Sequence, residues 1–504
     1  MHDHRHRFAL LLAAALLAVV AAWAGPALAD EAGASPTPAT ALLAEGTTES
    51  TATATATATD GATDGATPGG GGTGEGTGDA TATATASDEA TATATVTDTP
   101  TDTPTDTPTT EVPSPTATST PIPPPDPSFR PQAGLSSSNP YADGDLNQRG
   151  WVNQLNVLIQ NAPAGSTIRI MVMTLSIQDT IDQLLAADAR GVNVRIVLPL
   201  GFAKKERIAP LKSQLGRDVS KGSWITFCHG ACYRGGDAGV MHAKQFLFSQ
   251  TGVARHVFMI TGGNLDSSHY RIKYNDAWTV VGDSVAYAKE AKFFDGMKVD
   301  HKAAVPEPFT SNGIKYYFFP RAGTNLFSRV LNGTTCTGVT AGAGTGGRTV
   351  VRMVTSLWDS GRIGVARRLI ALSRAGCDVR VTVQSYRTTQ PVLTLLRNSH
   401  IKIRKSDTVD YTKGNHSKYL AISGNVLGDR SNNTVVTGSV NLTPSDSVGC
   451  TNNMIRILDS RSAFLDYSQN FDRIWDTGRS ISEAAVAAAP AALPQGAAAV
   501  ALDK

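Results

Sequence analysis

The chain is poor in cysteine, and the few cysteines are not spaced like the ligands of a zinc site. The 504 residues contain five: Cys228, Cys232, Cys336, Cys377 and Cys450. The stretch CHGAC, residues 228–232, brings two of them together, but no second ligand pair at zinc spacing follows. We therefore expect a small disulfide loop at CHGAC. Because the count is odd, at least one thiol must stay free or pair with another chain.

Long apolar runs are also missing, except at the start of the chain. Two arginines precede the run FALLLAAALLAVVAAWAG, and the triplet ALA at residues 27–29 provides a small-x-small cleavage site. This order is typical of a secretory signal peptide, so residues 1–29 are predicted to be removed and the protein to be secreted. An uncleaved membrane anchor is the alternative, and the run is short for a membrane span. No later segment is predicted to span a membrane, and residues 481–504, rich in alanine and broken by prolines, are predicted to form a flexible tail.

Residues 30–128 lack nearly everything that a folded core needs. They contain no lysine or arginine, almost no large apolar side chain, and repeats such as TATATATATD and TDTPTDTPT. Such a composition buries too little apolar surface to offset the conformational entropy of the chain. We predict a disordered spacer rich in Thr, Ala, Pro and Gly. Its threonines would permit O-glycosylation in a secreted protein, although nothing in the sequence requires it.

Residues 129–504 carry a large excess of positive charge, which is not visible in the net charge of the full sequence. The full sequence has a formal net charge of only +2, because 15 acidic residues lie in the predicted spacer. Residues 129–504 hold 43 basic and 27 acidic side chains, a net charge of +16. A charge of this size favours anionic partners, such as phospholipid surfaces, nucleic acids or other phosphate-bearing polymers.

This basic part of the chain consists of two similar halves. In the first, the β-branched stretch STIRIMVMTLS is followed by an amphipathic stretch ending at Gly191 and then by VNVRIVLPL. In the second, RTVVRMVTSL is followed by an amphipathic stretch ending at Gly376 and then by CDVRVTVQ. Each half closes with a predicted helix, at residues 286–297 and 463–475. Strand, helix and strand in this order predict parallel strands joined by crossover helices.

The duplication predicts the fold class and the domain organisation. We expect an α/β fold of two repeats, residues 129–308 and 309–480, packed about a pseudo-twofold axis around one shared active site. The stretch KYYFFPRAG, near residue 315, is expected to open the second repeat. We expect a monomer, since one chain contains both repeats.

A nine-residue pattern occurs once in each half. MHAKQFLFS (241–249) and NHSKYLAIS (415–423) both place a histidine, any residue and a lysine before an apolar run. Their alternation predicts a strand that directs each histidine and its lysine to the same face. Each pattern is followed by a Gly-rich turn, TGGN or TGSVN, that ends in asparagine. The candidate site residues are His242, Lys244, Asn264, His416, Lys418 and Asn441.

Two imidazoles, two ammonium groups and two amides suit the cleavage of a phosphodiester. Lysine and asparagine donors can hold the charge that spreads over the equatorial oxygens of the transition state. One imidazole can attack phosphorus in line and form a phosphohistidine, while the other protonates the leaving alkoxide and later activates water or an alcohol. This chemistry needs no metal, and we expect no cofactor. The remaining histidines have no counterpart in the other half and are expected to have ordinary surface or structural roles: His229, His256, His269, His301 and His400.

At these residues the chain resembles the phospholipase D superfamily, whose signature is His-x-Lys-x4-Asp followed by Gly-Ser/Gly-x-Asn, twice per active site. The resemblance covers nearly all of residues 133–480. It implies that His242 and His416 are the nucleophile and the general acid/base, with His242 favoured as the nucleophile. It also implies that the motif lysines and the turn asparagines bind phosphate. Asn275 and Asn453 resemble a supporting asparagine that family members carry after the Gly-rich turn.

The chain departs from the family pattern at one position of each motif. The aspartate of the signature is Ser249 in the first copy and Ser423 in the second. This departure leaves open which group orients each imidazole. Asp266, Asp276 and Asp446 lie nearby in the sequence and are candidates.

Charge, export and resemblance together favour a secreted phospholipase D-type phosphodiesterase that cleaves phospholipid head groups at a membrane surface, with head-group exchange as a further capacity. A secreted, metal-independent nuclease or other phosphodiesterase of the same superfamily is the alternative. A protein that binds anionic lipid or polymer without catalysis is a third hypothesis. The predicted export, the two repeats in one chain and the lack of a recognisable nucleic-acid module favour the lipid substrate.

Overall fold

A computed structural model describes residues 122–323, 325–399, 401–408 and 412–481. The predicted signal peptide, the predicted spacer up to residue 121 and the predicted tail from residue 482 lie outside these ranges. The last residues of the predicted spacer already contact the fold. The backbone N–H of Asp126 donates to the side-chain oxygen of Asn161 at 2.7 Å.

Each half of the described fold is built on a mixed β-sheet, and the two sheets repeat one strand order. Among the described residues, the first sheet has seven strands, in the order β1 (Gly134–Ser137), β8 (Asp276–Val280), β6 (Ala254–Thr261), β5 (Gln245–Thr251), β2 (Thr167–Met171), β3 (Asn193–Pro199) and β4 (Trp224–Cys228). The matching strands of the second sheet are β10 (Ile314–Phe319), β18 (Asn452–Ile457), β17 (Asp429–Gly438), β16 (Tyr419–Val426), β12 (Val350–Thr355), β13 (Asp378–Val383) and β14 (Lys402–Lys405). Shorter strands add to the second sheet or join the halves: β9 (Phe309–Ser311), β11 (Thr334–Thr335), β19 (Arg479–Ser480), β7 (Lys273–Tyr274) and β15 (Gly414–Asn415). The repeated order confirms the predicted duplicated α/β fold.

The predicted strand–helix–strand units are confirmed in both halves. Strands β2 and β3 pair in parallel, and so do β12 and β13. The crossover helices are α3 (Gln178–Ala189) and α8 (Ile363–Arg374). Each ends shortly before a glycine in the left-handed region, Gly191 with φ 88° and Gly376 with φ 92°. Glycine takes this conformation without the steric cost of a Cβ, which explains why the chain can turn there into the next strand.

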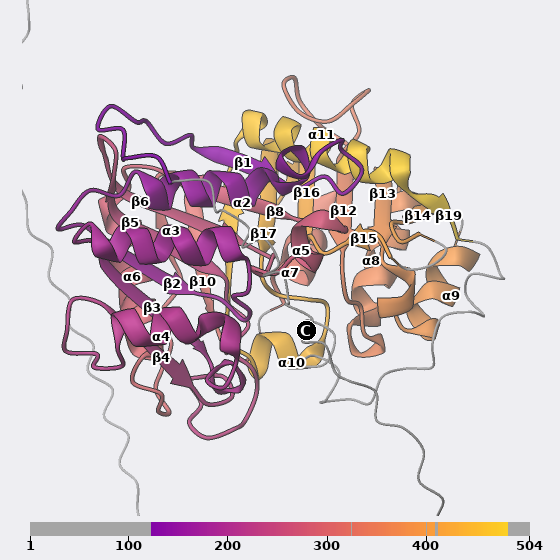
Figure 1. The fold of residues 1–504 in the computed structure, drawn as a ribbon. Helices are drawn as coiled ribbons and strands as arrows, with labels where there is room; N and C mark the ends of the chain where they lie inside the picture. Colours follow the sequence, from indigo (N-terminus) through magenta and orange to yellow (C-terminus); the bar gives the residue numbers. More distant parts are fainter. Residues whose placement is uncertain (1–121, 324, 400, 409–411, 482–504) are drawn as a thin grey trace, which may run out of the picture. The chain divides into compact units, whose positions relative to one another are not determined.

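Helices cover the outer face of each sheet, and two more help to fill the region between them. Helices α2 (Asp145–Gln160), α3 and α4 (Ala209–Leu215) pack on the first sheet, where Figure 1 shows α2 and α3 side by side. Helices α7 (Leu326–Asn332), α8 and α9 (Gln390–Asn398) pack on the second. Helices α6 (Ser284–Met297) and α11 (Arg461–Thr477) confirm the predicted closing helices. The short helices are α5 (Ser268–Arg271) and α10 (Pro444–Val448). None of the helices that the structure describes is both long and apolar enough to cross a bilayer.

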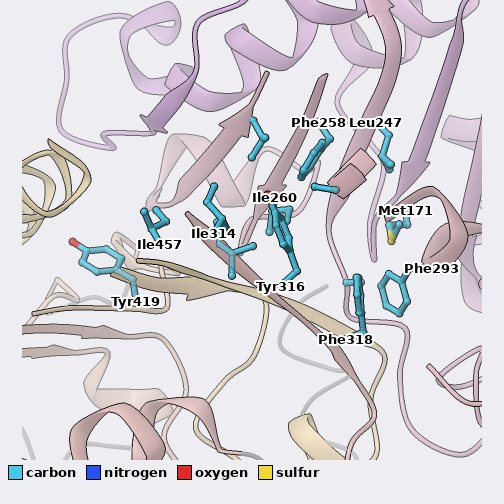
Figure 2. Packing of buried hydrophobic residues seen from close by; sticks show 14 of the residues in the cluster. Met171, Leu247, Phe258, Ile260, Phe293, Ile314, Tyr316, Phe318, Tyr419 and Ile457 are labelled. Atoms are coloured by element: carbon cyan, nitrogen blue, oxygen red, sulfur yellow. The ribbon is translucent and has the colours of Figure 1, made fainter. Parts of the chain in front are cut away.

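A shared hydrophobic core joins the two sheets. Leu247 of β5 and Phe258 of β6 belong to the same buried cluster as Tyr316 of β10 in the second sheet (Figure 2). The neighbours of Leu247 on β5, Phe246 and Phe248, instead belong to the outer cluster under α2 and α3. This alternation lets one strand contribute to two cores. Full burial of each such side chain stabilises the fold by about 1.5–3 kcal/mol.

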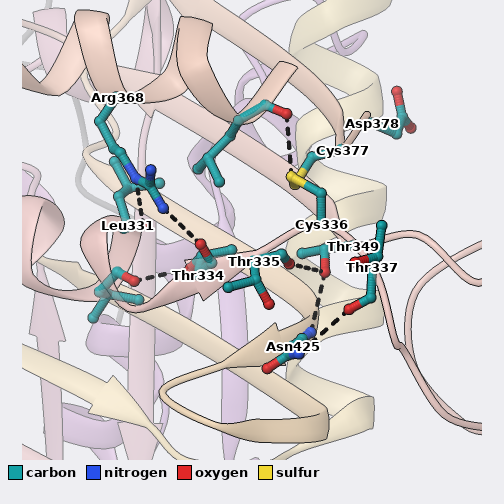
Figure 3. The surroundings of a disulfide bond; sticks show 12 residues. Leu331, Thr334, Thr335, Cys336, Thr337, Thr349, Arg368, Cys377, Asp378 and Asn425 are labelled. Carbon is teal, nitrogen blue, oxygen red and sulfur yellow. Dashed lines mark hydrogen bonds between the residues drawn. A yellow bond between two sulfur atoms is a disulfide. The ribbon is translucent and has the colours of Figure 1, made fainter. Parts of the chain in front are cut away.

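The cysteines form two disulfides and leave one thiol. Cys228–Cys232 confirms the predicted loop. Cys336–Cys377 ties β11 to the start of β13 in the second sheet (Figure 3). Cys450 is free and buried. Burial raises the pKa of the Cys450 thiol to about 12, so this thiol stays protonated and unreactive at neutral pH.

Candidate active site

The two histidine motifs lie immediately before β5 and β16, not inside a strand. Residues 242–244 precede the first residue of β5, and residues 416–418 precede the first residue of β16. The predicted strand is confirmed for residues 245–249 and 419–423 of the two patterns and was wrong for the His-x-Lys residues themselves. The physical reason is that the backbone N–H of each histidine is bonded to the opposite half of the molecule, which the local sequence pattern does not reveal.

The two halves exchange backbone hydrogen bonds at the histidines. The N–H of His242 donates to the carbonyl oxygen of Thr451 at 2.8 Å, and the N–H of His416 donates to that of Tyr274 at 2.7 Å. Just before His416, β15 also pairs in parallel with β7 of the first half. Each histidine is thus positioned by the half to which it does not belong.

The side chain of each histidine is also oriented from the opposite half. Nδ1 of His242 lies 2.8 Å from Oδ1 of Asn452, and Nδ1 of His416 lies 3.2 Å from Oδ1 of Asn275. Both amide nitrogens donate to backbone carbonyl groups, which fixes the amide oxygen as the atom that faces the imidazole. Nδ1 therefore carries the donated proton, and Nε2 carries the lone pair of the neutral ring. The amides thus direct Nε2 of each ring toward the chemistry, and at His416 the ammonium nitrogen of Lys418 also lies 2.9 Å from Nδ1 and 3.1 Å from Nε2.

The supporting amide of the second half is Asn452, and the expectation of Asn453 was wrong by one position. Asn264 and Asn275 are eleven residues apart, and so are Asn441 and Asn452. Equal spacing from the Gly-rich turn is the sequence signal that identifies the equivalent residues.

Both motif lysines are buried beside the histidines. Nζ of Lys244 donates to the carbonyl oxygen of His242 at 2.8 Å, and Nζ of Lys418 donates to that of His416 at 2.8 Å. Nζ of Lys418 also lies 2.9 Å from Nδ1 of His416. These ammonium groups place positive charge next to the imidazoles, where an anionic substrate gains most from it. Among the described residues, no three His, Cys, Asp or Glu side chains are grouped in a way that would hold a metal ion.

The two turn asparagines are buried with hydrogen-bonding capacity that the described residues do not use. Asn264 is fully buried, and neither Oδ1 nor Nδ2 of its side chain has a hydrogen-bond partner in the described part of the chain. The same holds for Oδ1 of Asn441, which is 4% exposed. Leaving a buried polar atom unpaired costs about 1–3 kcal/mol, which a ligand with polar groups would recover. These amides therefore have atoms available for a polar ligand, and their binding of phosphate stays a prediction.

The Gly-rich turns of the two halves meet, and glycine is required there for space. A Cβ added to Gly262 would lie 3.1 Å from the carbonyl oxygen of Gly438. A Cβ on Gly263 would lie 3.0 Å from Oδ1 of Asn275, the amide that orients His416. Gly438 itself has φ 144°. The turns can approach each other this closely because glycine, which has no side chain, stands at the contact.

The serines at the motif aspartate positions form hydrogen bonds to the backbone and to a neighbouring strand, and in these bonds they do not contact the imidazoles. Oγ of Ser249 accepts from the backbone N–H of Thr167 at 2.8 Å. Oγ of Ser423 accepts from the N–H of Gly344 at 2.8 Å and donates to Oδ1 of Asn433 at 2.7 Å. The orienting role belongs to the two asparagines.

Of the carboxylates of the three aspartates that the sequence suggested, that of Asp266 contacts a side chain that packs against a motif imidazole. Asp276 accepts from the hydroxyl groups of a threonine and a tyrosine, and Asp446 accepts from the backbone of its own turn. Asp266 lies 2.7 Å from Nδ1 of His269, and the ring of His269 packs against that of His416 with 4.3 Å between centroids. His269 was not singled out in the sequence, because no histidine occupies the matching position of the second half.

A family model described as "Cardiolipin synthase, PLD-like domain" matches residues 156–297 and 348–475. These segments include the six candidate residues and both orienting asparagines. No curated protein matches the chain.

Several solved structures are similar to the chain at low sequence identity. The polyphosphate kinase of Porphyromonas gingivalis is 16% identical with a TM-score of 0.43, over 68% of this chain and 50% of that one, so this chain spans about half its length. The phosphatidylserine synthase of Haemophilus influenzae is 12% identical with a TM-score of 0.46, over 66% of this chain and 86% of that one. Nuc, a phospholipase D family member from Salmonella typhimurium, is 17% identical with a TM-score of 0.26, over 35% of this chain and all of that one.

Proposed function

Because the chain belongs to the phospholipase D superfamily, we propose that it is a secreted phosphodiesterase that cleaves the head groups of phospholipids. The observation that carries the proposal is the crossed arrangement of the doubled motif. Asn452 of the second half orients His242, and Asn275 of the first half orients His416. Two oriented imidazoles, each with a buried lysine beside it, are what a two-step displacement at phosphorus requires.

In the first step, Nε2 of His242 attacks phosphorus in line, and the bond from phosphorus to the head-group oxygen breaks. The imidazolium of His416 donates its Nε2 proton to that oxygen, so the head group leaves as a neutral alcohol. Buried Lys244 and Lys418 and the turn amides hold the equatorial oxygens as charge spreads over them. The product is a phosphohistidine on His242.

In the second step, neutral His416 takes a proton from water, whose oxygen attacks phosphorus as the bond to His242 breaks. Phosphatidate leaves, and both imidazoles return to their starting protonation states. An alcohol that replaces water in this step would give head-group exchange.

The choice of lipid rests on the charge and on the predicted export. Residues 129–504 have a net charge of +16, which suits an anionic surface and also suits nucleic acid. From the predicted signal peptide we propose that the protein is secreted and that it acts as a monomer on phospholipid. A secreted nuclease is the second candidate, favoured by the same charge.

The purified protein should be assayed on mixed phospholipid vesicles and on plasmid DNA, with EDTA present. We expect release of head groups and intact DNA. Cleaved DNA with intact lipid would contradict the lipid proposal and support the nuclease. Binding to both without turnover would support a non-catalytic binder.

The same assay tests whether the chemistry is independent of metal. A soluble aryl phosphodiester should be cleaved in EDTA, because imidazoles and ammonium groups supply the acid, the base and the charge. Complete loss of this activity in EDTA, restored by a divalent cation, would contradict that expectation. The soluble substrate excludes effects of cations on the lipid surface.

A further inference from the structure

A third histidine lies against the proposed acid/base of the site. His269, on the short helix α5, is fully buried. Its ring meets that of His416 edge-on, with 4.3 Å between the centroids and 86° between the planes. On the other side, Nδ1 of His269 lies 2.7 Å from both carboxylate oxygens of Asp266. Carboxylate, imidazole and imidazole therefore form one continuous row of contacts.

The carboxylate at the end of this row is held in its ionised form. Burial raises the pKa of Asp266, but the neighbouring His269 and bonds from two hydroxyl groups outweigh it and bring that pKa well below its ordinary value. The hydroxyls are those of Ser268 and Thr174, at 2.6 and 2.7 Å. A fixed negative charge thus stands one imidazole away from His416.

His269 also contacts His416 by a second route. Its backbone carbonyl accepts a hydrogen bond from the amide nitrogen of Asn275, whose oxygen faces Nδ1 of His416. His269 is therefore linked to the His416 ring both by direct ring contact and through the amide that faces Nδ1 of His416.

The other half of the molecule keeps the backbone part of this arrangement and lacks the imidazole. Asp446 follows Asn441 by five residues, as His269 follows Asn264. The carbonyl of Asp446 accepts from the amide nitrogen of Asn452 at 2.8 Å. Its carboxylate instead accepts from the backbone N–H of Asn441 at 2.6 Å. The imidazole–carboxylate pair is thus specific to the half that orients His416.

The pair supplies a negative charge, which neither Asn275 nor Lys418 supplies to His416. The oxygen of Asn275 belongs to a neutral amide, and the ammonium group of Lys418, 2.9 Å from Nδ1, opposes a positive charge on the ring. A general acid must nevertheless carry that charge before it donates its proton. The negative charge of Asp266, acting through the polarised ring of His269, favours the imidazolium of His416.

We propose that Asp266 and His269 are a positioning pair that holds His416 as the general acid/base and so makes the two chemically similar halves unequal. The proposal rests on the proposed phosphodiester cleavage and assigns the roles within it. No proton moves along the row: His269 keeps its Nδ1 proton, Asp266 stays ionised, and His416 alone exchanges a proton with the leaving alcohol and then with water.

The test compares leaving groups in the variants Asp266→Asn and His269→Gln. Bis(p-nitrophenyl) phosphate releases a good leaving group that needs little protonation, whereas diphenyl phosphate releases a poorer one that depends on the acid. We expect kcat on diphenyl phosphate to fall at least about tenfold. Nitrophenol should still appear in a fast initial burst, followed by slow turnover, because the second step needs His416 as a base. The high-pH limb of the rate profile should move to lower pH, because the imidazolium of His416 is no longer stabilised by the negative charge of Asp266.

His229→Gln is the matched control. His229 forms the same kind of pair with Asp300, at 2.6 Å, on an exposed part of the surface. Its rates and pH profile should equal those of the wild type. Should His269→Gln fail to fold, Asp266→Asn, which is nearly isosteric, decides the question.

Equal losses on both aryl substrates with an unchanged pH profile would overturn the positioning pair and leave a structural role. Unchanged rates on both would overturn it as well. The wild-type protein separates the two proposals, because cleavage of aryl diesters without cleavage of phospholipid would contradict only the lipid substrate. A wild-type protein that cleaves none of them would overturn both.

Discussion

Asn275 and Asn452 orient the two imidazoles through uncharged amide oxygens. The residues that set the orientation of each ring are therefore not the residues that stabilise or oppose its positive charge. An amide oxygen fixes which nitrogen carries the proton but adds no net negative charge. The lysines oppose a positive charge on either ring, and at His416 the carboxylate of Asp266 behind His269 favours it. The proposed nucleophile and the proposed acid therefore differ in surroundings although their own motifs match.

Removing the amide of Asn452 should reduce catalysis much more than stability. In Asn452→Ala, Nδ1 of His242 loses the acceptor at 2.8 Å, and the ring can turn or change tautomer. We expect kcat to fall about a hundredfold, by analogy with other groups that orient an active-site residue. The matched control is Asn433→Ala, which removes a buried amide of the same sheet that bonds Ser423. Comparable losses of kcat in both variants, at temperatures where both are folded, would contradict the orienting role.

The serines at the motif aspartate positions should be dispensable for the chemistry. Ser249→Ala and Ser423→Ala each remove hydroxyl contacts within a sheet and touch neither imidazole partner named above. We expect each to cost about 1 kcal/mol of stability, with kcat within about twofold of the wild type. Thermal melts and steady-state rates check the two parts separately. A large fall in kcat with an unchanged melting temperature would show that these serines act in the site.

The sequence predicted the histidines, lysines and turn asparagines because they are repeated at matching positions in two halves. It did not predict Asn452 or His269. Asn452 stands beside another asparagine, and local similarity alone did not distinguish it from Asn453. His269 has no histidine at the matching position of the second half. Its proposed role depends on a side-chain contact with His416, which lies 147 positions later in the sequence and in the other half.

At the scale of elements, the strand–helix–strand units follow directly from local pattern. β-branched runs favour strands, and apolar residues at helical spacing favour helices that cover a sheet. The motifs themselves were predicted as strands because they alternate, but β5 and β16 begin only after each lysine. Backbone pairing with the opposite half outweighs the local alternation there. This cross-pairing depends on tertiary structure, which the sequence pattern does not contain.

The disulfide Cys336–Cys377 should stabilise the second half without affecting the site. The two cysteines are 41 positions apart and join the end of β11 to the start of β13. Near the disulfide, Arg368 donates a hydrogen bond to the carbonyl oxygen of Thr334, and the hydroxyl of Thr349 donates to the carbonyl oxygen of Thr335 (Figure 3). Replacing both cysteines by serine should lower the free energy of unfolding by about 2–4 kcal/mol. Turnover measured well below the new melting temperature should be unchanged. A loss of kcat in the folded variant would contradict the separation of this element from the site.

At the scale of the whole molecule, the two halves share one core, and α6, which contributes to that core, carries the buried carboxyl of Glu290. Glu290 of α6 is 1% exposed, and Oε2 of its carboxyl has no hydrogen-bond partner among the described residues. Burial raises the pKa of Glu290 to about 8, from an ordinary value of 4.5. Between these values the folded protein holds a proton that the unfolded chain has lost. Stability is therefore highest below about pH 4.5 with respect to this group, and it falls as the pH rises to about 8.

Glu290→Gln should remove this pH dependence. The free energy of unfolding of the variant should exceed that of the wild type by a margin that grows between about pH 5 and about pH 8. Chemical denaturation at both ends of this range measures the margin. Glu206→Gln, at an exposed glutamate, is the control and should change nothing. A margin that is constant or shrinks with pH would contradict the burial of an uncharged carboxyl.

The central claim is that the two halves complete a single active site, and kcat of three variants tests it most directly. His242→Ala and His416→Ala should each lower kcat at least about a thousandfold, and the double variant should be scarcely worse, because groups that act as one unit are non-additive. Melting temperatures close to that of the wild type would confirm that the variants are folded. If either single variant keeps about half of the wild-type activity, each motif belongs to a separate site and the account of one shared site is wrong.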